Sequence, residues 1–167
     1  MKRTRRKSLL VFLTLFFILW ATGCSQRSGS GFLRKEFLEY KSVAVLRFEG
    51  DDSGEVSKAF VNHFQERFPQ ISILGGKVFL DNFKKERFDV NQLNEETRSK
   101  IGKTIGAQAL ITGTIYSPSI LSWFLQVKII DTETGKVMGR SMVEIDSLFS
   151  IDIEKAAHLA VEKLSLW

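Results

Sequence analysis

The chain has 167 residues, two prolines and a formal charge of +5, which suits one folded domain and argues against disorder. All 19 acidic residues follow Cys24, whereas five of the 24 basic residues precede it. The part after Cys24 is therefore neutral in formal charge, and the apparent basicity gives no support for a nucleic-acid partner.

The first 24 residues have the three-part order of a secretory signal peptide. A basic start from Lys2 to Lys7 leads into an apolar run, Ser8 to Trp20, and then into Ala21-Thr22-Gly23-Cys24. An uncleaved membrane anchor is the alternative, but this apolar run has 13 residues and a bilayer span needs roughly 20. We therefore expect residues 1–23 to be a signal peptide, cut between Gly23 and Cys24.

Cys24 is the only cysteine, which excludes a disulfide within the chain. A buried, inert cysteine is the alternative, but this one lies at the edge of the signal segment. Small residues followed directly by cysteine resemble the lipobox of bacterial lipoproteins. That resemblance implies a diacylglycerol on the Cys24 sulfur and hence a membrane as partner. Ser25 in place of aspartate is similar to the signal for outer-membrane sorting, so we expect a lipid-anchored envelope protein facing the periplasm.

Residues 24–41 are expected to hold the lipidated cysteine and a tether. The small, polar run from Ser25 to Gly31 is typical of a flexible linker. From Phe32 to Tyr40, the spacing of Leu33 and Phe37 favours a short amphipathic segment that packs on the domain. Docking to a partner or to a membrane surface is the alternative for this segment. The domain itself is expected over residues 42–167.

The domain is predicted to open with a strand, a helix and a second strand. Ser42–Phe48 is rich in branched apolar residues and predicts a buried strand. Asp52 or Ser53 can cap a helix that runs to about Phe68. Ile71–Leu74 predicts a short strand. The apolar face of the helix comprises Val56, Ala59, Phe60, Phe64 and Phe68.

Two further helices are predicted before the next strand. Residues 77–88 mix apolar and charged side chains and favour a short helix. A clearer helix runs from about Gln92 to Ile105, with apolar residues four apart. Gly106 is placed to end it in a left-handed conformation.

Three strands in succession are predicted next. Ala107–Tyr116 is the first, and Ser117-Pro118 is expected to end it. Ser119–Ile130 and Lys136–Ile145 should form a hairpin around a turn at Asp131–Gly135. In the first strand of this hairpin, Trp123, Leu125, Val127 and Ile129 alternate with Phe124, Gln126 and Lys128.

A closing helix from about Ile151 completes the expected order, β-α-β-α(α)-β-β-β-α. Its apolar stripe comprises Ile153, Ala156, Ala157, Ala160, Val161 and Leu164. Strands joined through helices tend to be parallel and strands joined by tight turns are antiparallel. We therefore expect an α/β (α+β) fold with one mixed sheet of about five strands, covered by helices.

Three segments in this order resemble a known domain. They are Val43–Phe48, Ile105–Ile115 and Val127–Val137. The chain is similar, over residues 42–166, to the periplasmic domain shared by the curli-secretion component CsgG, the lipoprotein activators of penicillin-binding proteins, the flagellar lipoprotein FlgO and the N-terminal domain of TolB. The resemblance implies this fold and an envelope role through protein contacts, and it does not imply catalysis.

The chain departs from the pore-forming branch of that family. A membrane barrel needs added hairpins with strands of about 9–11 residues. The joins at Ile115–Ser119 and Ile145–Ser150 are too short to hold such hairpins. We therefore do not expect a pore.

The sequence offers few residues for catalysis or metal binding. His63 flanks an apolar helical face, and His158 lies between Glu154 and Glu162 with the spacing that could bring them to one metal. A packed histidine and a solvated charged face are the favoured interpretations. Gly102-Lys103-Thr104 imitates the end of a phosphate-binding loop but lacks the upstream glycine. We expect no enzyme activity, no cofactor and no metal.

The leading hypothesis is a non-catalytic lipoprotein whose domain binds another cell-envelope protein in cell-wall, flagellar or secretion machinery. Exposed edge strands or the Trp123–Phe124 neighbourhood would form the contact, although core packing is the favoured interpretation of these aromatics. A subunit of a ring-shaped homo-oligomer is the alternative. A periplasmic enzyme or small-ligand binder is a distant third.

Overall fold

The computed structural model describes residues 29–74, 101–102, 104–119, 122–146 and 152–167, and in that part a six-stranded mixed sheet carries two named helices. The strand order is β1-β6-β5-β4-β2-β3. β1 pairs antiparallel with β6, β6 with β5 and β5 with β4, whereas β2 is parallel to both β4 and β3. The mixed sheet expected from the sequence is confirmed.

The bounds of the elements follow the expected order, with one strand added at the start. The strands are β1 (Gly29–Leu33), β2 (Ser42–Val45), β3 (Ser72–Leu74), β4 (Ala109–Ser119), β5 (Ser122–Asp131) and β6 (Val137–Asp146). The helices are the 3₁₀ turn η1 (Lys35–Glu39), α2 (Glu55–Arg67) and α5 (Ile153–Glu162). The short helix expected over residues 77–88 lies outside the described residues.

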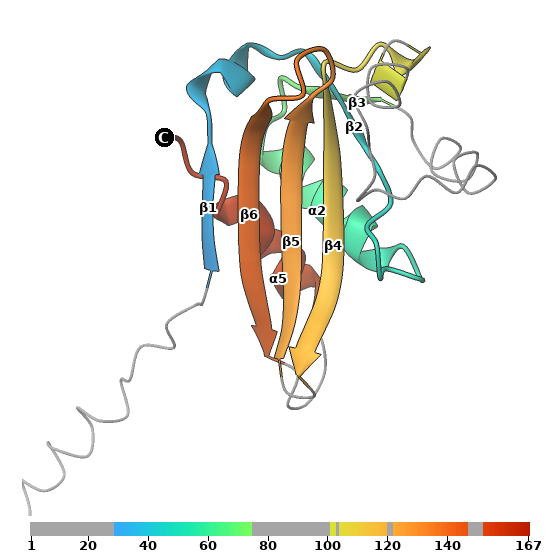
Figure 1. Cartoon of the computed structure of the whole chain (residues 1–167), viewed down its shortest axis with the longest axis vertical. Helices are drawn as coiled ribbons and strands as arrows, with labels where there is room; N and C mark the ends of the chain where they lie inside the picture. The colour runs from blue at the N-terminus through green and yellow to red at the C-terminus, as the bar shows by residue number, and fades with distance from the viewer. Residues whose placement is uncertain (1–28, 75–100, 103, 120–121, 147–151) are drawn as a thin grey trace, which may run out of the picture.

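Both α2 and α5 cover the same face of the sheet (Figure 1). The apolar faces predicted for the two helices are buried there together with the inward residues of β5, Leu125, Val127 and Ile129. On the opposite face a smaller cluster, which includes Ala44, Ile101 and Leu110, covers the sheet near β2. We call the face opposite α2 and α5 the open face, a name that refers to the described residues alone.

The predicted tether is wrong from Gly29 onwards. Gly29–Leu33 is an edge strand paired with β6, and Leu33 is fully buried. Phe37 in η1 is also fully buried, with its ring 6.3 Å from that of Phe64. Packing, the favoured interpretation of Phe32–Tyr40, is thus confirmed. The sequence indicated a linker because the first three residues of this strand, Gly29, Ser30 and Gly31, carry no large side chains.

The cap of α2 also differs from the prediction. Gly54, at φ +75°, holds the cap position in place of Asp52 or Ser53, and the Ser53 hydroxyl accepts a hydrogen bond from the Glu55 amide (3.2 Å). The buried carboxylate of Asp51 accepts hydrogen bonds from the Ser57 amide (2.8 Å) and the Ser57 hydroxyl (2.7 Å). Asp51, which also accepts from the Val56 amide, and Ser53 together satisfy the first turn of α2.

Of the predicted ends of two other elements, one is confirmed and the other is wrong. Gly106 follows a helical segment at φ +74°, as expected, and the amide of Ala107 reaches back to the Gly102 carbonyl (3.1 Å). Pro118, by contrast, does not end its strand, because β4 continues to Ser119 across a register shift after Tyr116. An irregular pairing tolerates a residue that has no amide hydrogen.

Candidate interaction surface

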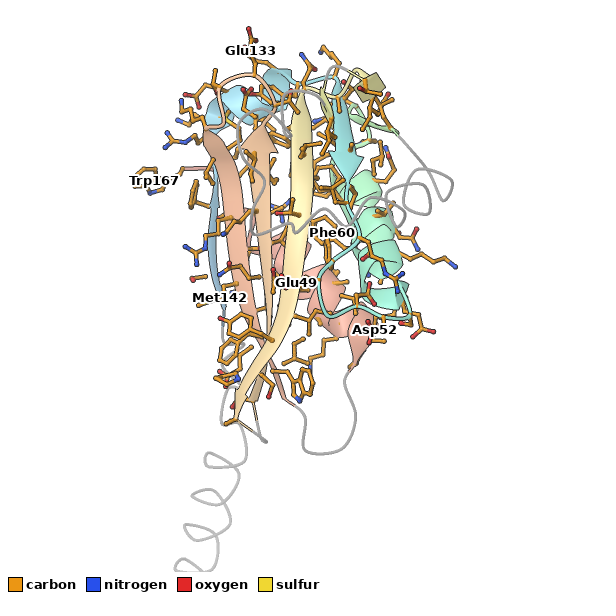
Figure 2. All side chains as sticks on the ribbon, turned by 45° about the vertical axis from the view of Figure 1, so that its right-hand side comes forward. Glu49, Asp52, Phe60, Glu133, Met142 and Trp167 are labelled. Atoms are coloured by element: carbon orange, nitrogen blue, oxygen red, sulfur yellow. The ribbon has the colours of Figure 1, made fainter. Side chains whose placement is uncertain are left out.

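The part of the open face near Ser119 and Ser122, where β4 ends and β5 begins, carries an aromatic stack on these two neighbouring strands. Tyr116 on β4 and Phe124 on β5 are cross-strand partners, with ring centroids 5.5 Å apart and planes at 19°. The Tyr116 hydroxyl also lies 3.6 Å from the sulfur of Met142 on β6. We call Tyr116, Phe124 and Met142 the aromatic patch, of which Met142 is labelled in Figure 2.

The two aromatics singled out from the sequence are separated by the sheet. Trp123 is partly buried and packs against the core under the helices, as the favoured interpretation expects. Phe124 is the next residue of the same strand and therefore points to the open face. Its neighbour Tyr116, 39% exposed, was not singled out. The alternation of Thr112, Thr114 and Tyr116 with apolar residues was the sequence signal for a strand face that includes Tyr116. Only the strand pairing shows that Tyr116 lies beside Phe124.

Between the aromatic patch and the Asp131–Gly135 turn, two cations face each other on neighbouring strands. Lys128 on β5 and Arg140 on β6 are directly paired, and Phe32 on β1 continues the row. Like charges opposite each other destabilise a sheet by a few tenths of a kcal/mol or more. This placement concentrates positive charge on the middle of the open face, where an acidic group of a partner would be favoured.

The β1 edge of the sheet is partly covered by the end of the chain. The Leu33 amide donates to the Ser165 carbonyl (2.7 Å), and the Trp167 amide donates to the Leu33 carbonyl (3.0 Å). A Cβ on Gly31 would lie 2.7 Å from the Arg140 carbonyl oxygen and closer still to that of Lys163. Only glycine allows this approach, so this end of β1 is not open for pairing with another strand.

At the end of the sheet that carries the Asp131–Gly135 turn, the Tyr40 hydroxyl donates to the Asp131 carboxylate. Partial burial and this bond raise the pKa of Tyr40 well above its usual value. Burial alone would raise the pKa of Asp131, but hydrogen bonds from Tyr40 and Thr134 outweigh it and lower that pKa. The pair ties the segment after η1 to the turn that was predicted at Asp131–Gly135.

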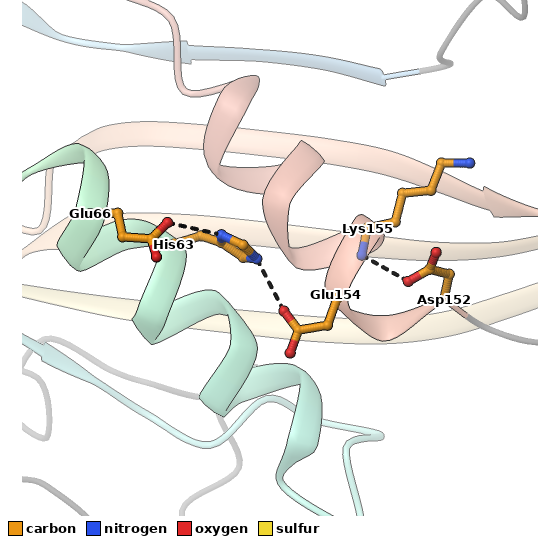
Figure 3. Close-up of polar contacts among 5 residues, drawn as sticks. All are labelled: His63, Glu66, Asp152, Glu154 and Lys155. Carbon is orange, nitrogen blue, oxygen red and sulfur yellow. Dashed lines mark hydrogen bonds and ion pairs between the residues drawn. The ribbon is translucent and has the colours of Figure 1, made fainter.

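The two histidines meet on the helical side of the molecule. Their rings are 5.2 Å apart, and His63 Nε2 lies 3.1 Å from a Glu154 oxygen (Figure 3). His63 Nδ1 is 3.4 Å from Glu66. Within the described ranges, no group of three or more histidine, cysteine, aspartate or glutamate side chains could hold a metal ion. This arrangement can join α2 to α5 by hydrogen bonds.

Gly102, which imitated part of a phosphate-binding loop, has a packing role. It lies in the helical segment before Gly106, and a Cβ there would lie 2.7 Å from Thr132 Cγ2. The Thr132 hydroxyl donates to the Ala107 carbonyl (2.9 Å). Close packing of this helix end against Thr132 explains the glycine. Lys103 lies outside the described residues.

Cys24 and Gly23, the predicted lipid and cleavage sites, lie outside the described residues. Among the residues that the structure does describe, no helix is both long and apolar enough to cross a membrane.

Comparison with known proteins shows the fold. No family model matches the sequence, and no curated protein matches it. A PelC dodecamer structure from Paraburkholderia phytofirmans aligns with a TM-score of 0.52 and 11% identity, over 82% of this chain and 93% of that one. Lipoprotein GNA1162 from Neisseria meningitidis aligns with a TM-score of 0.50 and 15% identity, over 64% and 80%. TolB from Acinetobacter baumannii gives 0.52 and 10%, over 74% of this chain and 27% of TolB. This chain thus shares its fold with bacterial proteins that include a lipoprotein.

Proposed function

We propose that this chain is a non-catalytic lipoprotein of the bacterial envelope, anchored by lipid on Cys24, whose domain binds another envelope protein. The observation that carries the proposal is the charged, apolar and small order of the first 24 residues, which ends in the sole cysteine. Gly29, in β1, lies five residues after Cys24. Small residues directly before a cysteine fit cleavage and lipid attachment at Cys24, a short distance along the chain from β1. The fold shared with lipoprotein GNA1162 supports the same proposal.

The anchor is tested by replacing the sulfur that would carry the lipid. Cys24→Ser should abolish incorporation of labelled fatty acid and release the protein from the membrane fraction. Ser25→Ala, which leaves the cysteine in place, is the matched control and should still be labelled. Fatty-acid labelling that persists in Cys24→Ser would contradict the anchor.

The open face is the surface that we propose for the protein partner. Its middle carries the paired cations Lys128 and Arg140 in one row with Phe32, and aromatic residues and arginine are enriched in protein interfaces. Outer-membrane sorting, suggested by Ser25, would place this face in the periplasm.

In-cell photo-crosslinking from two exposed cations tests this surface. A photoreactive amino acid at Arg140 should trap one specific envelope protein, identified by mass spectrometry. The same group at Lys58, exposed on α2, is the control and should not trap it. The proposal fails if both positions recover the same abundant porins and nothing else.

A second candidate is a subunit of a homo-oligomeric ring, favoured by the similarity to a structure described as a PelC dodecamer. This candidate predicts one large species of defined mass when the lipidated protein is purified in detergent. Light scattering that gives the mass of a single chain would exclude it. A periplasmic enzyme or a small-ligand binder remains the third and most distant candidate.

A further inference from the structure

The distance between the proposed lipid and the folded domain is short. Five residue steps separate Cys24 from Gly29, and an extended chain covers at most about 3.6 Å per residue. The first residue of β1 can therefore lie no more than about 18 Å from the Cys24 Cα. A domain held this closely cannot move freely in the space beyond the membrane, and the end of the sheet where β1 begins must face the lipid.

The strand register identifies what else lies at that end. Gly29 pairs with Val143, which pairs with Leu125. Beyond this row, towards Ser122, β5 continues for three residues, which adds about 10 Å in the direction away from the rest of β1. The end of the sheet formed by Ser119 and Ser122 is therefore closer to the lipid than Gly29 is. Figure 1 shows β1 starting at the same end of the sheet as the junction of β4 and β5.

The side chains at this end suit a membrane interface. Tyr116 and Phe124 lie one row beyond Gly29, on the open face, with the tyrosine hydroxyl 3.6 Å from the Met142 sulfur. Aromatic rings with a polar atom concentrate at the headgroup level of a bilayer. Glu144, the exposed cross-strand neighbour of Phe124, would have to remain in the hydrated headgroup layer, because a charge is costly in hydrocarbon.

We propose that the end of the sheet carrying Tyr116, Phe124, Ser119 and Ser122 rests on the lipid surface of the membrane that holds Cys24. This proposal depends on the lipid anchor proposed above. The sheet then stands upright, and the Asp131–Gly135 turn lies about 30 Å from the lipid, at the far end of the ten-residue strand β5. The paired cations Lys128 and Arg140 lie between the two ends, facing sideways towards a partner.

The sole cysteine makes this orientation measurable in the intact lipoprotein. A lipidated Cys24 cannot react with a maleimide, so a cysteine introduced elsewhere is labelled alone. An environment-sensitive fluorophore is placed at Ser119→Cys, and at Glu133→Cys, in the turn at the far end, as the control. The protein is reconstituted in vesicles of phosphatidylethanolamine and phosphatidylglycerol that contain a lipid with a shallow spin-label quencher. We expect loss of fluorescence at Ser119→Cys and none at Glu133→Cys.

The aromatic residues are tested in the Ser119→Cys background. Tyr116→Ser with Phe124→Ser should reduce the quenching while the protein still floats with the vesicles. Trp167→Ser removes a more exposed aromatic, 84% exposed, near Phe32 at the other end of β1, and should leave the quenching unchanged. Circular dichroism of each variant checks folding, and Tyr116→Ser alone replaces the double variant if that one unfolds.

The outcomes separate this proposal from the lipid anchor. Mass spectrometry reports the lipid on Cys24 directly. A lipidated protein that is unquenched at Ser119→Cys, or equally quenched at both positions, overturns the orientation and leaves the anchor intact. An unmodified Cys24 in a soluble protein overturns both, because nothing would then hold this end at the membrane.

Discussion

Asp51 is the clearest case of a single side chain that organises the fold. Its buried carboxylate accepts bonds from the amide and hydroxyl of Ser57, and the Ser57 hydroxyl oxygen in turn accepts the Phe48 amide (3.0 Å). Asp51→Ala leaves these buried donors unpaired, so we expect it to lower the free energy of unfolding by about 1–3 kcal/mol in urea denaturation.

Asp52, the adjacent exposed carboxylate, is the matched control for Asp51. Asp52→Ala should change the free energy of unfolding by less than about 0.5 kcal/mol, as surface substitutions commonly do. If the two variants proved equally stable, the role assigned to Asp51 would be wrong.

The Tyr40–Asp131 bond predicts a pH dependence with two limits. The pKa of Asp131 is lowered in the folded state, so its contribution is present above the unfolded pKa and disappears as pH falls through the folded one. The pKa of Tyr40 is raised, so its contribution is present below the ordinary tyrosine pKa and decreases as pH rises beyond it. Both contributions therefore exist between about pH 4 and pH 10.

Tyr40→Phe tests this window. Because the pair is only partly buried, the variant should lose about 1 kcal/mol at neutral pH. Thermal unfolding across the pH range should show the deficit shrinking below about pH 4 and above about pH 10. A deficit that stays constant with pH would mean that the substitution acts through packing alone.

At the scale of elements, β1 was missed because its sequence resembles a linker. Gly29, Ser30 and Gly31 carry no apolar side chains that would mark a strand, and their pairing with β6 involves residues more than a hundred positions away. The hairpin of β5 and β6 could be predicted, in contrast, because alternation and the Asp131–Gly135 turn are local signals. The aromatic patch could be predicted only in part. Both of the strands that carry Tyr116 and Phe124 were predicted, but the pairing of these two residues was not.

Gly31→Val tests whether β1 belongs to the packed fold. The new side chain would collide with the backbone at Lys163 and Arg140, so overpacking should lower the free energy of unfolding by about 1–3 kcal/mol. Ser30→Val, on the same strand and exposed, is the control and should be nearly neutral. Equal stability of the two variants in urea would indicate that the chain end does not pack on β1.

Arg67 joins the ends of the two helices. Its guanidinium donates to the carbonyls of Val161 (2.7 Å) and Leu164 (3.2 Å), at the C-terminus of α5. A cation at this position satisfies orphan carbonyls and interacts favourably with the helix dipole. Arg67→Met keeps the apolar stem and should cost about 1–2 kcal/mol in urea unfolding. Lys58→Met, exposed on the same helix, should not, and a similar loss from it would contradict this role.

At the scale of the whole molecule, the inclusion of β1 and η1 in the fold links stability to orientation. The sequence indicated a domain over residues 42–167 behind a long tether, whereas β1 and η1 contribute the fully buried Leu33 and Phe37. The ring centroid of Phe37 lies 6.3 Å from that of Phe64 in α2 and 6.2 Å from that of Phe68, the residue after the helix. Their inclusion in the core shortens the tether and therefore restricts how the domain can sit on a membrane.

A chain starting at residue 42 should accordingly be much less stable than one starting at Gly29. Removing buried leucine and phenylalanine side chains costs about 2–5 kcal/mol each, and a domain of this size has only about 5–15 kcal/mol in total. The deletion also leaves the edge of β6 unpaired, which favours aggregation. Urea unfolding of residues 29–167 should be cooperative, whereas residues 42–167 should unfold at low urea or be recovered insoluble. Equal unfolding midpoints would show that β1 and η1 only lie against the domain and that the tether is as long as the sequence suggested.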